Sequence, residues 1–126
     1  MAALNHLIVH VKDKDASAEF LADILGIEAG KQWGPFRPVQ TSNGVTLDFI
    51  DTDKVSPTHY AFLVDDQEFD HSFAKIRKAG LRYYARPDKS GPGEINTFYG
   101  GRGVYFEDPD GHLLELITRP YGEHPV

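Results

Sequence analysis

The sequence contains no cysteine among its 126 residues. This absence excludes disulfide bonds, metal sites built from thiolates and a cysteine nucleophile. It is also compatible with a reducing cytoplasm, where disulfides do not persist. Any metal site must therefore use nitrogen or oxygen donors.

The chain also lacks a long apolar run and an excess of positive charge. Hydrophobic residues make up 40% and charged residues 25% of the sequence, which are ordinary globular values and indicate neither disorder nor a membrane span. The formal net charge of -6 disfavours nucleic acid and anionic membranes as partners, because binding to phosphates relies on a basic face. Residues 1–4 lead directly into a predicted strand, without the charged and apolar regions of a signal peptide. We therefore expect a soluble, cytoplasmic protein that binds neither nucleic acid nor membrane.

A duplication is the most informative feature that is present. Residues 5–13 (NHLIVHVKD) return as residues 58–66 (THYAFLVDD). Each copy is followed later by an apolar strand with one acid, at residues 45–50 (VTLDFI) and 112–117 (HLLELI). One duplication therefore places two histidines and two carboxylates at matching positions.

The pattern of the first half predicts a strand, a helix and three further strands. The first strand covers about residues 4–11, Asp15 caps the helix, and Gly26 ends it. Asn43-Gly44 is a strong hairpin signal between the strands that follow.

The second half predicts the same order of elements. A strand at residues 59–64 precedes Asp65 and Glu68, which are spaced as a capping box, and Gly80 ends the helix. Residues 108–111 (DPDG) form a tight turn between the last two strands.

These elements predict an α+β fold of two tandem βαβββ modules. The first module covers about residues 4–55 and the second about residues 56–119, within a single domain of residues 1–126. A unit of this size buries too little apolar surface alone, so we expect the two modules to form a curved, mostly antiparallel sheet around a concave metal site.

The four polar residues at the duplicated positions are candidate metal ligands: His6, Asp48, His59 and Glu115. Side chains alternate along a strand, so each shares a face with apolar neighbours, as His6 does with Ile8, and we expect these faces to point to the core. A carboxylate among apolar neighbours is costly unless it is paired or bound to a cation. The alternative is that each buried group only satisfies a hydrogen bond of the core.

The donor types indicate which metals fit. Imidazole nitrogen with carboxylate oxygen suits Fe(II), Mn(II), Zn(II), Ni(II) or Co(II) better than Ca(II). Asp48 would be a fourth ligand, although aspartate reaches less far than glutamate. His10 shares a face with His6 but has no counterpart in the second copy, so it either supports a ligand or belongs to the core.

The chain resembles the vicinal oxygen chelate superfamily, which includes glyoxalase I, extradiol dioxygenases, fosfomycin-resistance metallothiol transferases and bleomycin-binding proteins. The resemblance covers nearly the whole chain and depends most on residues 4–7, 58–62 and 106–115. It implies a pair of βαβββ modules that often dimerise, with a metal chelated by neighbouring oxygens of the substrate. The ligands it implies are His6 and His59 with Glu115.

Departures from the family's patterns narrow the activity. Asp48 stands where glyoxalase I has a glutamate ligand, which argues against that activity. Tyr105 matches a tyrosine of the fosfomycin transferases, but Ile8 and Gly103 replace hydroxyl residues expected to contact that drug. The bleomycin-binding members lack the metal ligands that this chain has.

Residues of the two Gly- and Pro-rich segments, 31–38 and 88–96, and of the strands next to them are predicted to select the substrate. Aromatic side chains can stack on a flat ligand and arginines can meet a carboxylate or phenolate. The predicted substrate-binding residues are Trp33, Arg37, Tyr99, Arg102 and Tyr105. The alternative is that the aromatic residues belong to the core.

We therefore predict a metal-dependent lyase, transferase or dioxygenase in which Glu115 and Tyr105 are catalytic. Its divalent metal binds a small, oxygen-rich substrate, and the protein works as a homodimer. The alternative is a protein that sequesters a drug or natural product without catalysis. A scaffold for protein association is a third hypothesis, disfavoured because histidine and glutamate suit an apolar core poorly.

Overall fold

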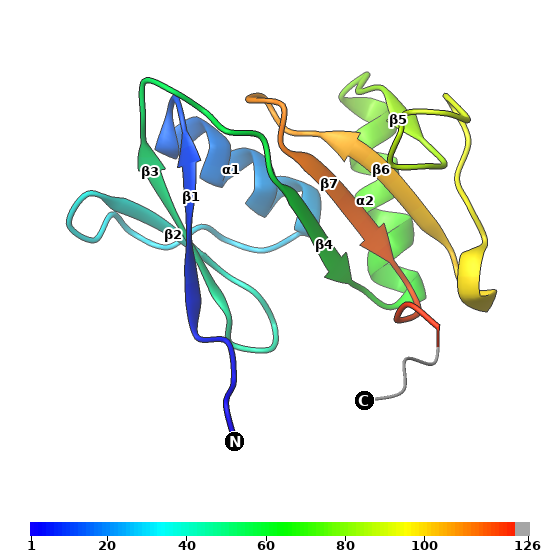
Figure 1. The fold of residues 1–126 in the computed structure, drawn as a ribbon, viewed down its shortest axis with the longest axis horizontal. Coiled ribbons are helices and arrows are strands. Elements are labelled where there is room, and N and C mark those ends of the chain that lie inside the picture. Colours follow the sequence, from blue (N-terminus) through cyan, green and yellow to red (C-terminus); the bar gives the residue numbers. More distant parts are fainter. Residues whose placement is uncertain (123–126) are drawn as a thin grey trace. The chain divides into compact units, whose positions relative to one another are not determined.

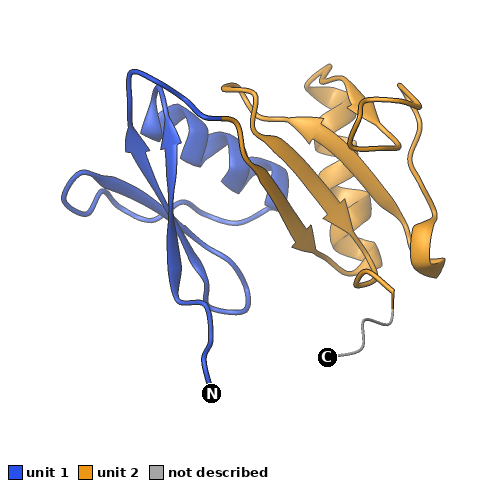
Figure 2. Cartoon of the chain, in the orientation of Figure 1, with its two compact units in different colours: residues 1–56 blue, residues 57–126 orange. Residues whose placement is uncertain are grey.

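The computed structural model describes residues 1–122. It divides into two units, Met1–Ser56 and Pro57–Val126 (Figure 2). In each unit a helix lies beside a sheet that has one parallel and at least one antiparallel pair of strands (Figure 1). The α+β fold class expected from the sequence is confirmed. No helix within the described residues has the length and apolar character needed to span a bilayer.

Unit 1 contains β1 (His6–Val11), α1 (Lys14–Leu25), β2 (Phe36–Gln40) and β3 (Thr46–Asp51). The strand order is β1-β3-β2, with β1 parallel and β2 antiparallel to β3. The predicted hairpin is the β2–β3 connection. In place of a third regular strand after the helix, an isolated bridge joins Trp33 to Phe36, in a segment that Gly and Pro interrupt.

The ends of α1 follow from local chemistry. Asp13 has extended backbone (φ -135°, ψ 101°), and its side chain accepts hydrogen bonds from the backbone N–H groups of Asp15 and Ala16. Asp15 as the cap was therefore wrong by two residues, because a cap must precede the first helical residue. Gly26 ends the helix in the left-handed conformation (φ 71°), as predicted.

Unit 2 is built from β4 (His59–Leu63), α2 (Asp66–Lys78), β5 (Tyr83–Tyr84), a short 3-10 helix η1 (Phe98–Gly100), β6 (Gly103–Glu107) and β7 (Leu113–Ile117). The strand order is β4-β7-β6-β5, with β4 parallel to β7 and the other pairs antiparallel. The capping box of α2 is confirmed, because Asp65 and Glu68 each accept a hydrogen bond from the other's backbone N–H.

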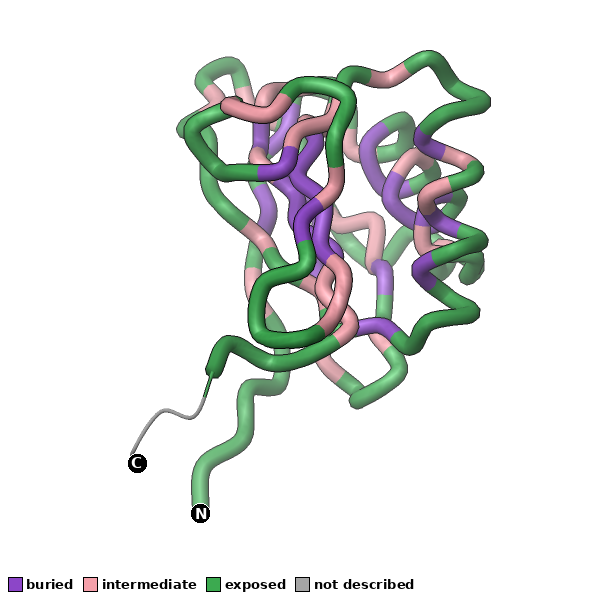
Figure 3. Tube along the Cα trace, turned by 90° about the vertical axis from the view of Figure 1, so that its right-hand side faces the viewer, coloured by how far each residue is buried: buried purple, intermediate pink, exposed green. Residues whose placement is uncertain are grey.

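Each unit has its own core between its helix and one face of its sheet. In unit 1 the buried strand residues are Val9, Val11, Val39, Leu47 and Phe49. In unit 2 they are Val104, Phe106, Leu114 and Leu116, together with Phe69 and Ile76 of α2. Fully burying a side chain of this size stabilises the fold by about 1.5–3 kcal/mol. Figure 3 shows the buried stretches on strands and helices and the exposed loops between them.

Candidate metal and substrate site

A buried carboxylate on the sheet of unit 2 is the centre of the candidate site. Glu115 lies on β7, opposite Ala61 of β4 and Tyr105 of β6, and is only 1% exposed. The Nε2 atom of His59 lies 3.0 Å from Glu115 Oε1. The other ring nitrogen, Nδ1, lies 3.2 Å from the carbonyl oxygen of Leu113. A proton on Nδ1 leaves the Nε2 lone pair for a cation, which is the usual arrangement of a metal-binding histidine.

Two tyrosines complete the surroundings of Glu115. The Tyr121 hydroxyl donates to both carboxylate oxygens, at 2.8 and 3.0 Å, and lies 3.3 Å from the Tyr105 hydroxyl. The ring of Tyr105 also stacks on His59, with ring centroids 5.9 Å apart. His59, Tyr105, Glu115 and Tyr121 therefore form one hydrogen-bonded and stacked cluster on the sheet face that points away from α2.

Both phenols of this cluster keep their protons at neutral pH. Burial, followed by the hydrogen bonds to Tyr121 and Glu115, raises the pKa of Tyr105 far above its usual value. For Tyr121, the hydrogen bond with Tyr105 acts to lower the pKa, but burial and the contact with Glu115 outweigh it and the pKa is raised. Each hydroxyl can therefore donate a hydrogen bond to an oxygen anion nearby.

The two predicted donors of unit 1 share one face of its sheet. His6 is in register with Thr46 and Ile8 with Asp48, so all four side chains lie on the same side of the β1–β3 pair. His6 is exposed, and its Nδ1 lies 2.7 Å from Asn5 Oδ1.

The expectation that the His6 face points to the core was wrong. The exposed fraction of Ile8 is 45%, and His10 on the same face is also exposed. The alternation of side chains was correct, but α1 covers the opposite face, which carries Val9 and Val11. In unit 2 the corresponding face is mixed, because His59 is exposed while Glu115 and Tyr105 are buried.

The structure divides the predicted donors between the units, with His6 and Asp48 in unit 1 and His59 and Glu115 in unit 2. Among residues 1–122 no group of three or more His, Asp or Glu side chains is close enough to hold a metal ion. Neither unit contains the complete predicted donor set. The chemistry of the unit 2 pair fits a divalent cation, since it joins an imidazole nitrogen to a buried carboxylate.

Arg37 does not lie on the face of the candidate ligands. It is in register with Phe49, on the helix side of the sheet, and its guanidinium bonds to Asp15 and Glu19 of α1 at 3.2 and 2.5 Å. Its Nε also donates to the carbonyl oxygen of Gly30 at 2.5 Å. The Glu19 hydrogen bond is the main reason that the pKa of Arg37 is raised. This arrangement ties β2 to α1, and we leave Arg37 out of the proposed site.

Arg102 has a similar structural position in unit 2. Its guanidinium donates to Asp70 at 2.7 Å and to Asp66 at 3.1 Å, both on α2. It also lies over the Phe69 ring, 4.5 Å from the ring centroid. Because these contacts hold it against the helix side of the sheet, Arg102 is likewise left out of the proposed site.

Two of the predicted aromatic residues, Trp33 and Tyr99, are exposed and available to a ligand. Trp33 is 71% exposed and stacks on Phe36, whose partner in register, Ile50, shares the face of Asp48. Tyr99 is 56% exposed and its ring lies 5.4 Å from that of Tyr121. Trp33 and Tyr99 are therefore surface residues, whereas the ring of Tyr105 is buried and its hydroxyl contacts that of Tyr121.

Tyr121 was missed by the sequence reasoning. It lies beyond the end predicted for the second module, and no spacing rule links it to Glu115. A lone aromatic residue six positions after a strand acid carries no local signal, because only the path of the chain after β7 brings it back to the carboxylate.

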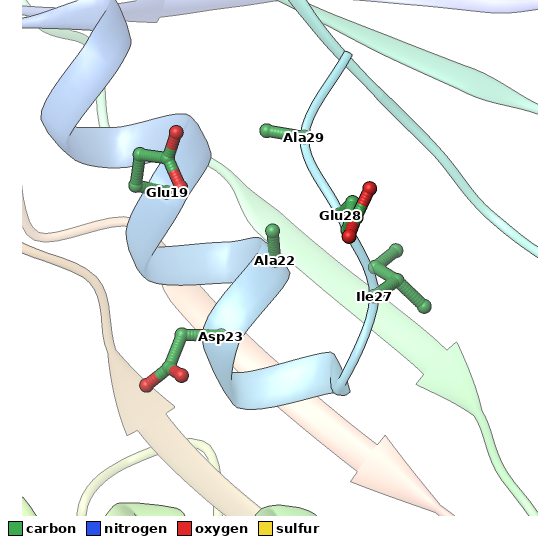
Figure 4. Close-up of a pocket in the computed structure, with 6 residues that line it drawn as sticks. All are labelled: Glu19, Ala22, Asp23, Ile27, Glu28 and Ala29. Carbon is green, nitrogen blue, oxygen red and sulfur yellow. The ribbon is translucent and has the colours of Figure 1, made fainter.

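The structure also has pockets away from these residues. One, of about 320 Å³, lies between α1 and the segment after it and is lined by Glu19, Ala22, Asp23, Ile27, Glu28 and Ala29 (Figure 4). Another, of about 440 Å³, lies beside β5 and is lined by Leu81, Arg82, Tyr83, Tyr84, Pro92 and Gly93. Neither contains a predicted metal ligand.

Comparison with known proteins identifies relatives that cover nearly the whole chain. Two solved structures, Oxidase ChaP-H2 and Oxidase ChaP-H1, are 58% and 59% identical to this chain, each with a TM-score of 0.95. The match to ChaP-H2 covers 97% of both chains, and the match to ChaP-H1 covers 98% of this chain and 100% of the other. Glutathione transferase FosA of Serratia marcescens is 29% identical over 92% of this chain and 80% of that protein.

A further relative is Metallothiol transferase FosB of Shouchella clausii, which is 28% identical over 95% of this chain and 82% of that protein. The relatives bear out the expectation of a metal-dependent enzyme that acts on a small molecule. Residues 3–116 match the family model for the Glyoxalase/Bleomycin resistance protein/Dioxygenase superfamily. The chain is therefore a member of the Glyoxalase/Bleomycin resistance protein/Dioxygenase superfamily.

Proposed function

We propose that this protein is a metal-dependent oxidase that transfers electrons from a small, oxygen-bearing aromatic molecule to dioxygen. The observation that carries the proposal is the likeness of 58–59% identity, over nearly the whole chain, to two proteins named oxidases. The aromatic residues Trp33 and Tyr99 support a flat substrate, because both present exposed rings that can stack on one.

His6, His59 and Glu115 are the residues that would hold the cation, with Asp48 as a fourth ligand. Two imidazoles and one carboxylate are the donor set of non-haem iron oxygenases, so we propose Fe(II) among the metals that fit. When bound, the cation supplies Lewis acidity that polarises two neighbouring oxygens of the substrate.

The chain's own residues supply the rest of the chemistry. Glu115 is buried, and contacts with His59 and Tyr121 hold its carboxyl group in position. Tyr105 keeps its proton and stacks on His59, so its hydroxyl can donate a hydrogen bond to a substrate oxygen that gains negative charge. We therefore assign Tyr105 to substrate binding and catalysis.

The test combines metal analysis with oxygen uptake. Protein purified without chelators is analysed for metals, and dioxygen consumption is then measured with catechols and hydroquinones. We expect stoichiometric metal and uptake that Glu115→Gln abolishes and Glu107→Gln retains, since Glu107 is a carboxylate of β6 paired with Lys89. Protein that neither contains nor takes up a divalent metal would refute the proposal.

Thiol transfer to an epoxide is a second candidate, favoured by the FosA and FosB relatives at 26–29% identity. Ile8 and Gly103, where contact with fosfomycin is expected to need hydroxyl groups, disfavour that drug as the substrate. Incubation with glutathione and fosfomycin distinguishes the two activities, since a thioether product without oxygen uptake would identify a transferase. A ligand recovered unchanged, and bound equally well by His6→Ala, would instead identify a sequestering protein.

We also propose a cytoplasmic homodimer. What supports a dimer is that β1 and β4 are edge strands of their sheets, whose outer backbone groups can pair with a strand of another chain. Sedimentation velocity of the metal-loaded protein tests the oligomeric state.

A further inference from the structure

Two side chains, His59 and Tyr121, contact the carboxylate of Glu115. Oε1 is 3.0 Å from His59 Nε2, while the Tyr121 hydroxyl reaches both Oε1 and Oε2, at 2.8 and 3.0 Å. At 1% exposure the carboxylate has almost no contact with solvent that could orient it. Its orientation therefore depends on these two side chains.

The hydroxyl of Tyr121 is itself held in place. The ring packs on Tyr99 at an interplanar angle of 43°, and the hydroxyl contacts that of Tyr105. The segment that carries Tyr121 is anchored where it leaves β7, because Thr118 and Arg102 exchange hydrogen bonds of 2.8 and 3.0 Å. These contacts hold the Tyr121 hydroxyl beside Glu115.

We propose that Tyr121 is a positioning residue for Glu115. Its hydroxyl contacts both carboxylate oxygens, at 2.8 Å from Oε1 and 3.0 Å from Oε2, and this holds the carboxylate with Oε1 beside His59 Nε2 as the second half of a metal-binding pair. This inference rests on the proposed function, in which His59 and Glu115 hold the cation. Carboxylates that bind a metal are themselves hydrogen-bonded, and loss of such a partner costs about 10–100-fold in metal affinity.

The experiment compares Tyr121→Phe with Tyr99→Phe in the full, metal-stripped chain. Both changes remove one phenolic hydroxyl and keep the ring, but only Tyr121 donates to Glu115. Binding of Co(II) is followed by calorimetry and by the d–d absorption, which reports the geometry of the ligands. Tyr121→Phe should raise the Kd for Co(II) about 10–100-fold and shift the d–d bands, while Tyr99→Phe should stay within about threefold of wild type with an unchanged spectrum.

Melting of the metal-free variants shows whether each is folded. If Tyr121→Phe does not fold, Tyr121→Met serves as the second variant without a hydroxyl, since its flexible side chain adapts to its surroundings. An unchanged Kd and spectrum in the variant at position 121, or an equal loss in both Phe variants, would overturn the positioning role and leave the proposed function intact. Wild-type protein that binds no Co(II) would instead overturn the proposed function, and this inference with it.

Discussion

Replacing Glu115 by glutamine separates the role of its charge from that of its shape. The amide keeps an oxygen that can accept the Tyr121 hydroxyl, and its NH2 group can face His59 Nε2. At most about one hydrogen bond is weakened, which costs about 1 kcal/mol. Removing a charge from a group that is 1% exposed also removes a desolvation cost. We therefore expect the free energy of unfolding of the metal-free protein to change by less than about 1 kcal/mol.

The metal-bound proteins should differ much more. A ligand present at 100 times its Kd adds about 2.7 kcal/mol to the free energy of unfolding. For a chain of this size, 1 kcal/mol raises the melting temperature by about 4 °C, so metal should raise that of the wild type by about 10 °C. If Glu115→Gln weakens binding about 1,000-fold, the same metal concentration adds about 0.06 kcal/mol and gives no measurable shift.

The assay is thermal unfolding followed by circular dichroism, with and without Fe(II), Mn(II), Co(II), Ni(II) or Zn(II). Glu107→Gln is the control, because Glu107 is a partly exposed carboxylate on the neighbouring strand and should leave the metal-dependent shift intact. A shift of about 10 °C that survives in Glu115→Gln would show that this carboxylate is not a metal ligand. A large loss of stability in the metal-free variant would show that the carboxylate supports the fold through its charge.

Three further predictions concern the framework of the site. Arg37→Met should lower the free energy of unfolding by about 1 kcal/mol through loss of the ion pair with Glu19, and the loss should be smaller in 1 M salt. Metal affinity, measured by calorimetry, should not change. A changed metal affinity would show that Arg37 belongs to the metal site. Gly103→Ala places a Cβ atom 2.7 Å from Asn96 Oδ1 and should lower the free energy of unfolding, measured in urea, by about 1–3 kcal/mol. An unaltered urea midpoint would show that the Asn96 side chain moves away at no cost. Asp65→Ala removes the cap of α2 and should cost about 1 kcal/mol, which equilibrium unfolding tests; no loss would show that the capping box contributes little.

Local features of the fold were predictable because short-range chemistry decides them. Gly26 ends α1, and Asp65 with Glu68 caps α2, as the residue types indicated. One local error, Asp15 in place of Asp13 as the cap of α1, arose because both residues are acceptable caps and only the backbone conformation distinguishes them.

The site was predictable only in part. The duplication predicted His59 and Glu115 as ligands, and in the structure His59 Nε2 lies 3.0 Å from Glu115 Oε1. The roles predicted for Arg37 and Arg102 depended on which way their side chains point. Strand register and ion pairs with the helices set the direction of both side chains. Neither the register nor these ion pairs can be predicted from the amino-acid composition.

The sequence by itself determined the duplicated order of elements, their caps and turns, and which residues alternate on a common strand face, because these follow from interactions between near neighbours in the chain. Only the tertiary structure decided which face of each sheet the helix covers, and that Tyr121 meets Glu115. Both outcomes depend on contacts between side chains brought together by strand pairing and by the return of the chain after β7, for which a linear pattern has no signal.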